Sequence, residues 1–332
     1  MDTHRNDRDK AFRPLFLSLL FFSLLSCGGG GGSPSTDPPK TYFVVPSSAG
    51  GNDSNAGTAD APFATITHAL SVSQARDVIQ VAAGTYTPGS ATHLPTDPGE
   101  TFPILIKEGV SVVGEPFQTN ANAPGTVILG SGVYTSPTAG PLQAAVILAE
   151  GGSIARLTIR SQGGVGLIAE GVTGSISNSL FSTNKIGLFL IASHLSISNS
   201  AITGNETGIQ STAGDTSEID QNVLSNNTAG AALGVRISDA GPALRQNQIT
   251  GNPGGGVTVE GGAHPDLGGG GRSDGKNILS CNGGDLINQT DGAIFARNNL
   301  WDHAPPTPTD AVTPHGGTID TLGATLSSPR CG

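Results

Sequence analysis

The sequence is poor in charged residues, and this scarcity narrows the class of protein first. Asp, Glu, Lys and Arg make up 13% of its 332 residues, whereas typical soluble domains contain about 25%. So few charges argue against an ordinary soluble helical bundle. They also argue against disorder, because disordered chains usually carry a high net charge and few β-branched residues.

Basic residues are the scarcer of the two kinds of charge. The chain has 16 Lys and Arg against 26 Asp and Glu, which gives a formal net charge of −10. Nucleic-acid binding relies on basic residues that neutralise phosphates, so the sequence predicts no nucleic-acid partner. An anionic polymer would also be repelled on average.

Cysteine is almost absent, and the three cysteines do not have the spacing of a metal site. We therefore expect no metal and no cofactor. Cys281 and Cys331 could form a disulfide in an oxidising compartment, or they could remain two separate thiols. The oxygen-rich loop Gly51–Asn55 lacks the spaced carboxylates of a calcium-binding loop, and it favours a turn closed by its own side chains.

No hydrophobic run reaches the length of a membrane-spanning helix. The apolar run Leu15–Leu25 is too short to span a bilayer, and basic residues precede it. It leads into Leu-Leu-Ser-Cys ending at Cys27, which resembles the lipobox of bacterial lipoproteins. The resemblance implies that residues 1–27 are a lipoprotein signal peptide and that Cys27 is lipidated. The alternative is an ordinary secretory signal in which Cys27 is incidental.

Residues 28–40 are rich in Gly, Ser and Pro and are predicted to form a flexible tether without a core. Such a tether would hold a lipid-anchored domain away from the membrane. Gly28, directly after the cysteine, resembles the sorting pattern of lipoproteins that reach the outer membrane. We therefore expect a bacterial cell-envelope protein, located at the outer membrane or the cell surface.

Glycine and proline are abundant, with 49 and 22 residues. The glycines have no three-residue period, which excludes collagen. A turn-rich β protein is the class that remains.

Internal repeats define its architecture. Four nine-residue segments align without gaps and end on Asn, and a fifth, Asp274–Asn282, keeps the second half of the pattern. The closing residues lie at intervals of 21, 22, 25 and 30, and they are Asn184, Asn205, Asn227, Asn252 and Asn282. The opening position is apolar in each of the four, namely Ile176, Ile197, Ile219 and Leu244. Glycines follow three residues after the first four asparagines, at Gly187, Gly208, Gly230 and Gly255.

These columns predict that like side chains stack on one another from one turn of the chain to the next. Stacked asparagines would form a ladder of amide hydrogen bonds, in a backbone conformation at positive φ that Asn tolerates. The pattern resembles the right-handed parallel β-helix of the pectate-lyase-like superfamily. The two longest gaps in the repeat predict loops at 233–241 and 261–276.

The segment before the repeats resembles a second known pattern. It reads Gly51-Asn-Asp, then Pro62-Phe-Ala-Thr-Ile, and then Gly84-Thr-Tyr. This string is similar to the start of the bacterial family called domain of unknown function 1565, and the similarity covers residues 40–115. Thr65 is predicted to cap a short helix with Ile66, Ala69 and Leu70 on its buried side.

The predicted fold is therefore all-β, a right-handed parallel β-helix solenoid with a short N-terminal capping helix. The solenoid is expected over 41–302, with the cap and first turns at 41–115. A Pro-rich C-terminal tail is expected over 303–332. Trp301 and Phe295 are expected to close the C-terminal end, although Trp301 could instead stack on a sugar.

Enzymes of this superfamily imply two kinds of catalytic site. Polysaccharide lyases use calcium, stacked carboxylates and a basic residue, and glycosidases use clustered carboxylates as acid and base. The sequence has no Asp-Asp pair, and its histidines are scattered. The weak catalytic candidates are Glu206, Asp215, Glu218, Asp220, Arg236 and Arg245. Asp220 and Arg245 share a column in neighbouring turns, which favours a surface ion pair over a catalytic role for them.

The sequence thus predicts a monomeric lipoprotein, held to a membrane through Cys27, with a non-catalytic β-helix. Its expected work is to bind a polysaccharide or an envelope protein, or to serve as a surface scaffold. The enzymatic alternative is a polysaccharide lyase or a glycoside hydrolase.

Overall fold

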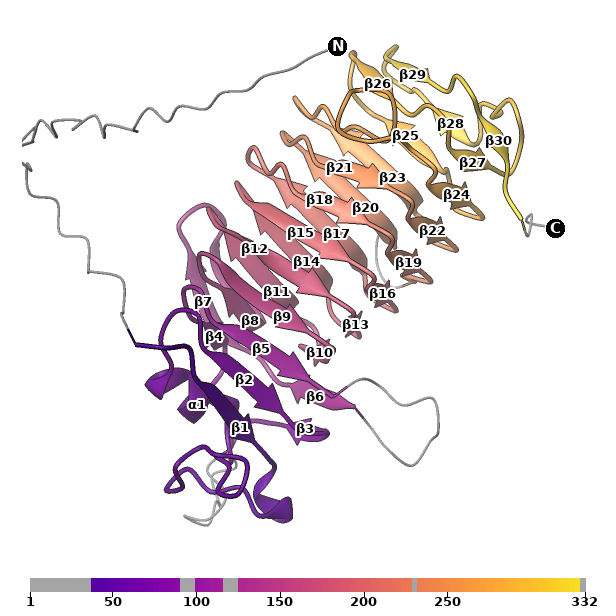
Figure 1. Cartoon of the computed structure of the whole chain (residues 1–332). Helices are drawn as coiled ribbons and strands as arrows, with labels where there is room; N and C mark the ends of the chain where they lie inside the picture. The colour runs from indigo at the N-terminus through magenta and orange to yellow at the C-terminus, as the bar shows by residue number, and fades with distance from the viewer. Residues whose placement is uncertain (1–36, 90–98, 116–124, 229–231, 329–332) are drawn as a thin grey trace, which may run out of the picture. The chain divides into compact units, whose positions relative to one another are not determined.

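Three short strands form each turn of the chain, and every strand belongs to a different parallel sheet. In the computed structural model, strands of successive turns stack in sequence order (Figure 1). The structure describes residues 37–89, 99–115, 125–228 and 232–328. The predicted signal peptide, Cys27 and Cys331 lie outside the described residues. None of the described helices is long and apolar enough to cross a membrane.

The first sheet has eight strands in one continuous order. They are β1 (Thr41–Val44), β2 (Val78–Val81), β5 (Ser111–Gly114), β9 (Gly152–Ala155), β12 (Thr173–Ser177), β15 (His194–Ser198), β18 (Glu218–Asp220) and β21 (Ala243–Arg245). A two-stranded sheet of β26 (Ala293–Phe295) and β29 (Thr318–Asp320) lies further along the chain. Single bridges from Ala243 to Asp266 and from Asp266 to Phe295 connect the two.

The second sheet has ten strands. They are β3 (Gly84–Tyr86), β6 (Thr126–Leu129), β10 (Leu157–Arg160), β13 (Leu180–Ser182), β16 (Ala201–Thr203), β19 (Val223–Ser225), β22 (Gln248–Thr250), β24 (Ile278–Ser280), β27 (Leu300–Trp301) and β30 (Thr325–Leu326).

The third sheet stacks nine parallel strands, with one antiparallel strand on its second member. The parallel strands are β4 (Ile104–Ile106), β8 (Gly140–Leu148), β11 (Val165–Glu170), β14 (Ile186–Ile191), β17 (Thr207–Thr212), β20 (Leu233–Ser238), β23 (Gly255–Glu260), β25 (Leu286–Asn288) and β28 (Ala311–Val312). β7 (Gly132–Ser136) pairs with β8. Together these sheets confirm the predicted parallel β-helix.

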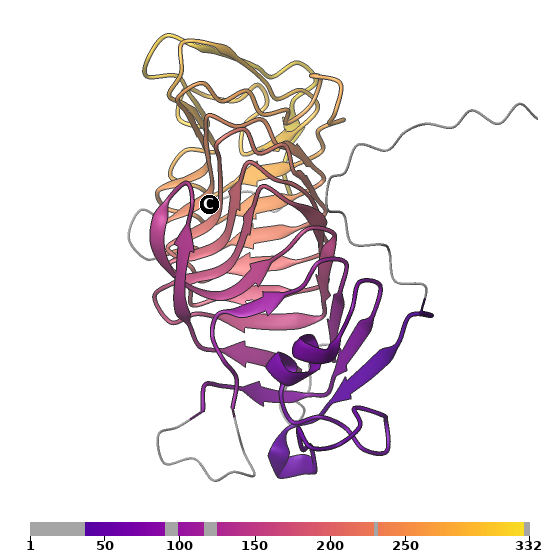
Figure 2. The same ribbon diagram turned by 90° about the vertical axis from the view of Figure 1, so that its left-hand side faces the viewer.

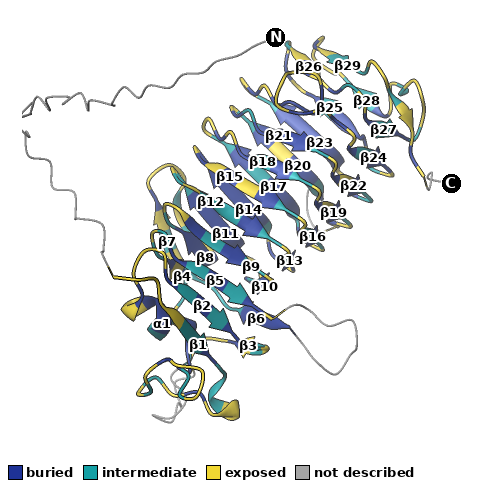
Figure 3. Cartoon of the chain, in the orientation of Figure 1, coloured by how far each residue is buried: buried dark blue, intermediate teal, exposed yellow. Residues whose placement is uncertain are grey.

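Apolar side chains at equivalent positions stack on one another from turn to turn, as predicted. Ile176, Ile197, Ile219 and Leu244 are register partners in consecutive turns and are fully buried. Strands are mostly buried, and the short connections between them are exposed (Figure 3). The main core is therefore a continuous column of mostly aliphatic side chains, and each turn buries its apolar face only because another turn lies against it.

The predicted asparagine ladder is present. The Nδ2 of Asn184 donates to Oδ1 of Asn205 at 3.0 Å, and Asn205 donates to Asn227 at 3.1 Å. The same bond continues to Asn252 and then to Asn282, at 2.9 and 3.0 Å. The expected positive φ is absent from these residues. It is present in the second amide-rich column of the repeat, which is exposed and consists of Asn178, Asn199, Gln221 and Gln246.

A second buried ladder was not predicted. It runs beside the first and second sheets through Asn222, Asn247, Asn277 and Asn299, with Nδ2–Oδ1 distances of 3.0–3.2 Å. Asn222 and Asn247 directly follow Gln221 and Gln246 of the exposed amide column. A shift of one residue separates an amide inside the solenoid from an amide in solvent.

The glycine column also needs a correction. Gly208 is aligned with Gly234 and Gly256 by the register of β17, β20 and β23. The predicted members were Gly255 and Gly230, and Gly230 lies outside the described residues. A Cβ on Gly208 would lie 2.4 Å from the carbonyl oxygen of Gly234, so only glycine allows the turns to approach here.

The N-terminal cap follows the prediction closely. α1 (Ile66–Val72) lies beside the first turns (Figure 2), after the short 3-10 helix η1 (Ser47–Ala49). Thr65 is its N-cap, with Oγ1 accepting from the backbone nitrogen of His68 at 3.0 Å. Its buried residues are Ile66, Ala69 and Leu70. The carboxylate of Asp53 accepts from the backbone nitrogens of Ala64 and Thr65, so the Gly51–Asn55 loop holds the start of the helix in place.

The C-terminal region is more ordered than a tail. Residues after 302 supply β28, β29 and β30, which add strands to the sheets before them. Trp301 is fully buried in the core, which rules out a sugar-stacking platform. Phe295 is 43% exposed and does not close the end. Residues 261–276 form the predicted loop, whereas the other predicted loop contains β20. Cys281 is disulfide-bonded, and its predicted partner Cys331 lies outside the described residues.

Candidate ligand-binding face

The outer surface of the first sheet carries two rows of serine hydroxyls. Ser111, Ser153, Ser175 and Ser196 are register partners in one row. Ser177 and Ser198 begin the second row. We call these six residues the serine face. The Oγ atoms of Ser153 and Ser111 are 2.7 Å apart, and neighbouring turns repeat at about 4.8 Å.

Local sequence explains why these serines point outward. In β12 and β15 the pattern is Ser-Ile-Ser, with Ile176 and Ile197 fully buried. Because successive side chains of a strand point to opposite faces, the serines on either side lie on the outer surface. The result is a surface of small hydroxyls with a regular spacing.

The serine face ends in a charged cluster. Glu218 continues the first row and Asp220 the second. Arg245 follows Asp220 in register, as predicted. Its Nε lies 3.3 Å from Asp220 and its Nη2 lies 3.5 Å from Glu218. Both carboxylates therefore contact one guanidinium, which is the arrangement of a surface ion-pair cluster.

An open polar hollow of about 600 Å³ lies next to this cluster. Its lining comes from β21, the 261–276 loop and the turn before β27, and consists of Arg245, Gln246, Gly269, Gly271, Arg272, Ser273, Asp274 and Asn298. Arg272 donates to the carbonyl oxygens of Gly241 and Thr216, both at 2.6 Å. This bond pair holds the loop against two earlier turns. A hydrogen bond from Lys276 keeps the pKa of Asp274 below its usual range.

The remaining candidates lie elsewhere. Asp215 is fully buried, and its oxygens accept from the hydroxyls of Ser211 and Ser217, both at 2.6 Å. Burial raises the pKa of Asp215, although those bonds oppose the shift. This carboxyl has a structural role.

Arg236 is on the third sheet and forms an ion pair with Glu260 at 2.6 Å. Glu206 lies between β16 and β17, at the corner of the second and third sheets. Of the six predicted catalytic candidates, the fold brings together only Glu218, Asp220 and Arg245. This set does not provide a separate acid and base.

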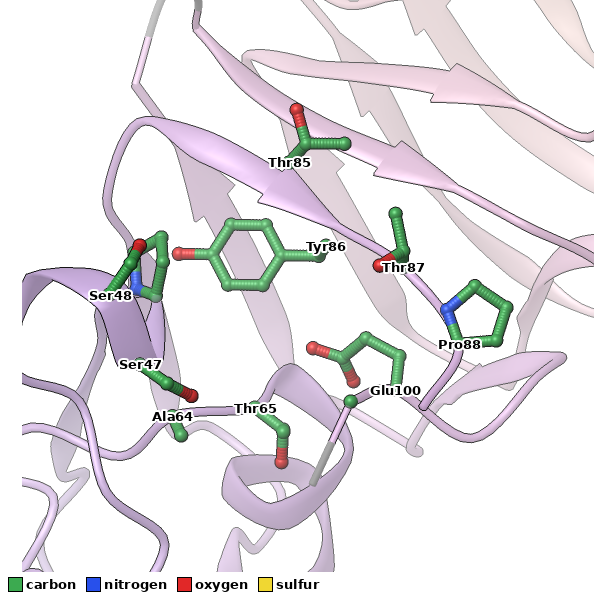
Figure 4. A pocket seen from close by; sticks show the side chains of 11 residues that line it. Ser47, Ser48, Ala64, Thr65, Thr85, Tyr86, Thr87, Pro88 and Glu100 are labelled. Carbon is green, nitrogen blue, oxygen red and sulfur yellow. The ribbon is translucent and has the colours of Figure 1, made fainter. Parts of the chain in front are cut away.

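A smaller pocket lies in the N-terminal cap (Figure 4). It measures about 240 Å³, and Tyr86 and Glu100 project into it. Glu100 accepts from the backbone nitrogens of Ile66 and Thr67, at 2.7 and 2.9 Å, and from the Thr67 hydroxyl at 2.6 Å. Burial raises the pKa of Glu100. The carboxyl is occupied with the start of α1, so the geometry favours a structural role for this pocket.

A group of three aspartates that sequence reasoning missed gathers near the C-terminal end. One ligand atom from each of Asp285, Asp302 and Asp310 lies within 4.8 Å of the other two. They are 17 and 8 residues apart in the sequence, so no short motif reveals them. The serine face was also missed, although the Ser-Ile-Ser alternation was a usable signal.

The stacked three-sheet architecture defines the class of fold, a parallel β-helix. Among solved structures, pectate lyase Pel9A is similar with a TM-score of 0.53 at 13% identity, over 89% of this chain and 78% of that one. Pectin methylesterase from carrot is similar with a TM-score of 0.48 at 13% identity, over 90% and 86%. At this identity the likeness extends to the fold alone.

The family is shown by the sequence itself. Residues 49–308 match the family described as protein of unknown function DUF1565, and the chain belongs to it. No curated protein matches the chain.

Proposed function

We propose that this is a lipid-anchored protein of the bacterial cell envelope, whose β-helix binds a neutral polysaccharide on the serine face without cleaving it. The observation that supports this proposal is the regular outward spacing of the six serines. Hydroxyl groups that repeat with every turn can form hydrogen bonds with a polymer that repeats along the same direction. The net charge of −10 favours a neutral polymer over an anionic one.

The charged cluster supports a binding role over a catalytic one. General acid–base chemistry needs two groups of different protonation state on either side of the reacting bond. Glu218 and Asp220 are instead held by the same arginine. At the end of the serine face they can accept hydrogen bonds from sugar hydroxyls.

Retention on insoluble xylan, compared with soluble polygalacturonate in affinity electrophoresis, tests the proposal. The double variant Ser177→Val and Ser198→Val removes two neighbouring hydroxyls and keeps the β propensity. We expect its binding to xylan to weaken about tenfold, since each hydrogen bond contributes about 0.5–1.5 kcal/mol. The control is Thr203→Val with Ser225→Val, on the outer side of the second sheet, which should bind as wild type does.

Two results would contradict the proposal. Equal binding by the serine variant and the control would remove the serine face from consideration. Release of 4,5-unsaturated uronates from polygalacturonate, abolished by Arg245→Ala, would instead favour a lyase at the hollow.

The anchor requires its own test. Wild-type protein should remain with the membrane fraction and incorporate labelled fatty acid. Cys27→Ala should lose the label and leave the membrane. Membrane retention of an unlabelled Cys27→Ala protein would contradict lipidation at this position.

A further inference from the structure

The three aspartates lie at the corner where the chain passes from the second sheet to the third. Asp285 directly precedes β25, and Asp310 directly precedes β28. Because Leu286 pairs with Ala311, the two aspartates occupy the same position in successive turns. Asp302 follows β27, whose Trp301 pairs with Leu279. The group thus spans two turns of the solenoid.

This corner is where the buried asparagine ladder stops. Asn282 accepts from Asn252 through Oδ1, as the earlier members of the ladder do. Its Nδ2 donates to Oδ1 of Asp285 at 2.8 Å. Neutral amides therefore give way to carboxylates at the end of the column. An amide both donates and accepts, whereas an ionised carboxylate only accepts.

One carboxylate oxygen is left without a protein donor. The side chain of Asp285 is only 2% exposed, and its Oδ2 is buried with no hydrogen-bond partner among the described residues. An unpartnered buried oxygen of this kind is costly for the folded state. Burial, together with the nearby charges of Asp302 and Asp310, raises the pKa of Asp285 to about 7. The surroundings are thus electrostatically suited to a positive ion.

The other two carboxylates are held in place by the chain. Oδ2 of Asp302 accepts from the backbone nitrogen of Cys281 at 2.8 Å. Oδ2 of Asp310 accepts from the backbone nitrogen of Thr307 at 2.8 Å and contacts Nδ1 of His303 at 2.9 Å. Such contacts orient a carboxylate before a ligand arrives.

The spacing of the oxygens fits one ion. Calcium–oxygen distances run from about 2.3 to 2.6 Å, so two ligands of one calcium ion can lie at most about 5 Å apart. The three ligand atoms lie within 4.8 Å of one another. The donors are all hard oxygens, which suit calcium better than zinc.

We propose that Asp285, Asp302 and Asp310 bind a calcium ion that joins the last two turns of the solenoid. The ion supplies the partner that Oδ2 of Asp285 lacks and offsets the repulsion among three carboxylates. Its expected effect is structural, since it links residues before β25 with residues on both sides of the 303–309 segment. The proposal does not depend on glycan binding by the serine face.

Calcium titration of the chelator-treated protein tests the site directly. Isothermal titration calorimetry with calcium chloride should give a heat for about one ion per chain. Thermal unfolding should shift upward by roughly 5 °C at a calcium concentration of about 100 times Kd. Magnesium chloride should produce a clearly smaller shift, because magnesium dehydrates reluctantly and demands octahedral geometry.

The variant Asp285→Asn keeps the size of the side chain and the acceptor for Asn282. In chelator it should unfold at or above the wild-type temperature, since the buried charge is gone, and calcium should no longer shift it. Asp302→Asn should lose the calcium response in the same way. The matched control is Asp60→Asn, an exposed aspartate in the N-terminal cap, which should respond as wild type does.

Wild-type protein without a calcium heat or thermal shift would overturn the site. So would a wild-type response in Asp285→Asn. An equal response to magnesium and calcium would overturn the choice of ion.

Discussion

The central turns and the two ends of the solenoid satisfy their buried polar groups in different ways. In the central turns, neutral asparagines donate to and accept from their neighbours, and the ladder is complete without any other molecule. At the N-terminal end, Asp53 and Glu100 accept from backbone nitrogens at the start of α1. At the C-terminal end, Asp285 accepts from Asn282 through one oxygen and lies beside the carboxylates of Asp302 and Asp310.

This difference distinguishes buried groups that only support the fold from buried groups that could bind a ligand. A residue that repeats in every turn is matched by its own copies, so it needs no ligand. A carboxylate that departs from the repeat needs a donor from elsewhere. The N-terminal end supplies that donor from a helix, whereas the C-terminal end leaves one oxygen unpartnered. Among the buried polar groups, departures from the repeat are therefore the places to search for a bound ion.

The largest expected effect is on a central ladder residue. Asn205→Ala would remove the acceptor of the Asn184 backbone nitrogen and the donor to the Phe181 carbonyl oxygen. We expect the free energy of unfolding to fall by about 3–5 kcal/mol, because buried polar groups lose their partners. Urea denaturation measures the change.

The exposed amide column provides the comparison for this variant. Asn199→Ala replaces an exposed residue at φ 51°, so its cost should be about 1 kcal/mol, from the left-handed backbone alone. Equal losses in the two variants would mean that the ladder contributes nothing beyond backbone conformation.

A smaller effect is expected from the glycine column. A methyl group on Gly208 would lie 2.4 Å from the carbonyl oxygen of Gly234, whereas one on Gly292, near the C-terminal end, would meet nothing closer than 3.5 Å. Gly208→Ala should therefore lower the melting temperature by the equivalent of about 2–3 kcal/mol. Gly292→Ala should be nearly neutral, and a larger loss there would invert the comparison.

The N-terminal end should show a pH dependence. Burial raises the pKa of Glu100, so the folded state binds its proton more tightly than the unfolded state does. The contribution of Glu100 is then fully present below its unfolded pKa of about 4.3 and is lost as pH rises through the folded value. As pH rises from the unfolded to the folded pKa of Glu100, the free energy of unfolding should therefore fall less in Glu100→Gln than in wild type.

Denaturant unfolding at a series of pH values measures this slope. The exposed Glu108 provides the control, since Glu108→Gln should keep the wild-type slope. A steeper loss in Glu100→Gln would indicate that the hydrogen bonds from Ile66 and Thr67 outweigh burial.

The smallest effect is expected at the surface ion pairs. The side chain of Arg245, which contacts Glu218 and Asp220, is 35% exposed. Ion pairs at such exposed positions contribute at most about 1 kcal/mol to the free energy of unfolding. Arg245→Ala should therefore change the unfolding free energy by less than about 1 kcal/mol. A larger loss would show that the charged end of the serine face also supports the fold.

Much of the fold could be predicted because its repeats are strict. Apolar residues and asparagines at intervals near 22 predicted both the stacking of Ile176 on Ile197 and the ladder from Asn184 to Asn282. Prediction failed where the number of residues between a ladder asparagine and the next strand varies. The glycine that follows Asn227 lies four residues later than expected, at Gly234, and the next lies one residue later, at Gly256. The acidic residues of the last two turns carry no repeat at all.

The candidate site was only partly predictable. The contact between Asp220 and Arg245 followed from their shared column. The separation of Asp215, Glu206 and Arg236 from that contact did not follow. Glu206 and Asp215 lie in connections at two different corners of one turn, and Arg236 lies on the third sheet in the next turn. Arg272 and Asp274 reach the same hollow from a loop whose path the repeats do not determine.

The sequence by itself determined that this chain stacks, because its apolar and amide residues recur at a spacing that only successive turns can satisfy. The tertiary structure alone decided which amides are buried, which hydroxyls face solvent and which carboxylates meet. A one-residue offset turns a side chain from the core to the surface. Stacking also brings together aspartates that lie 17 and 8 residues apart in the chain.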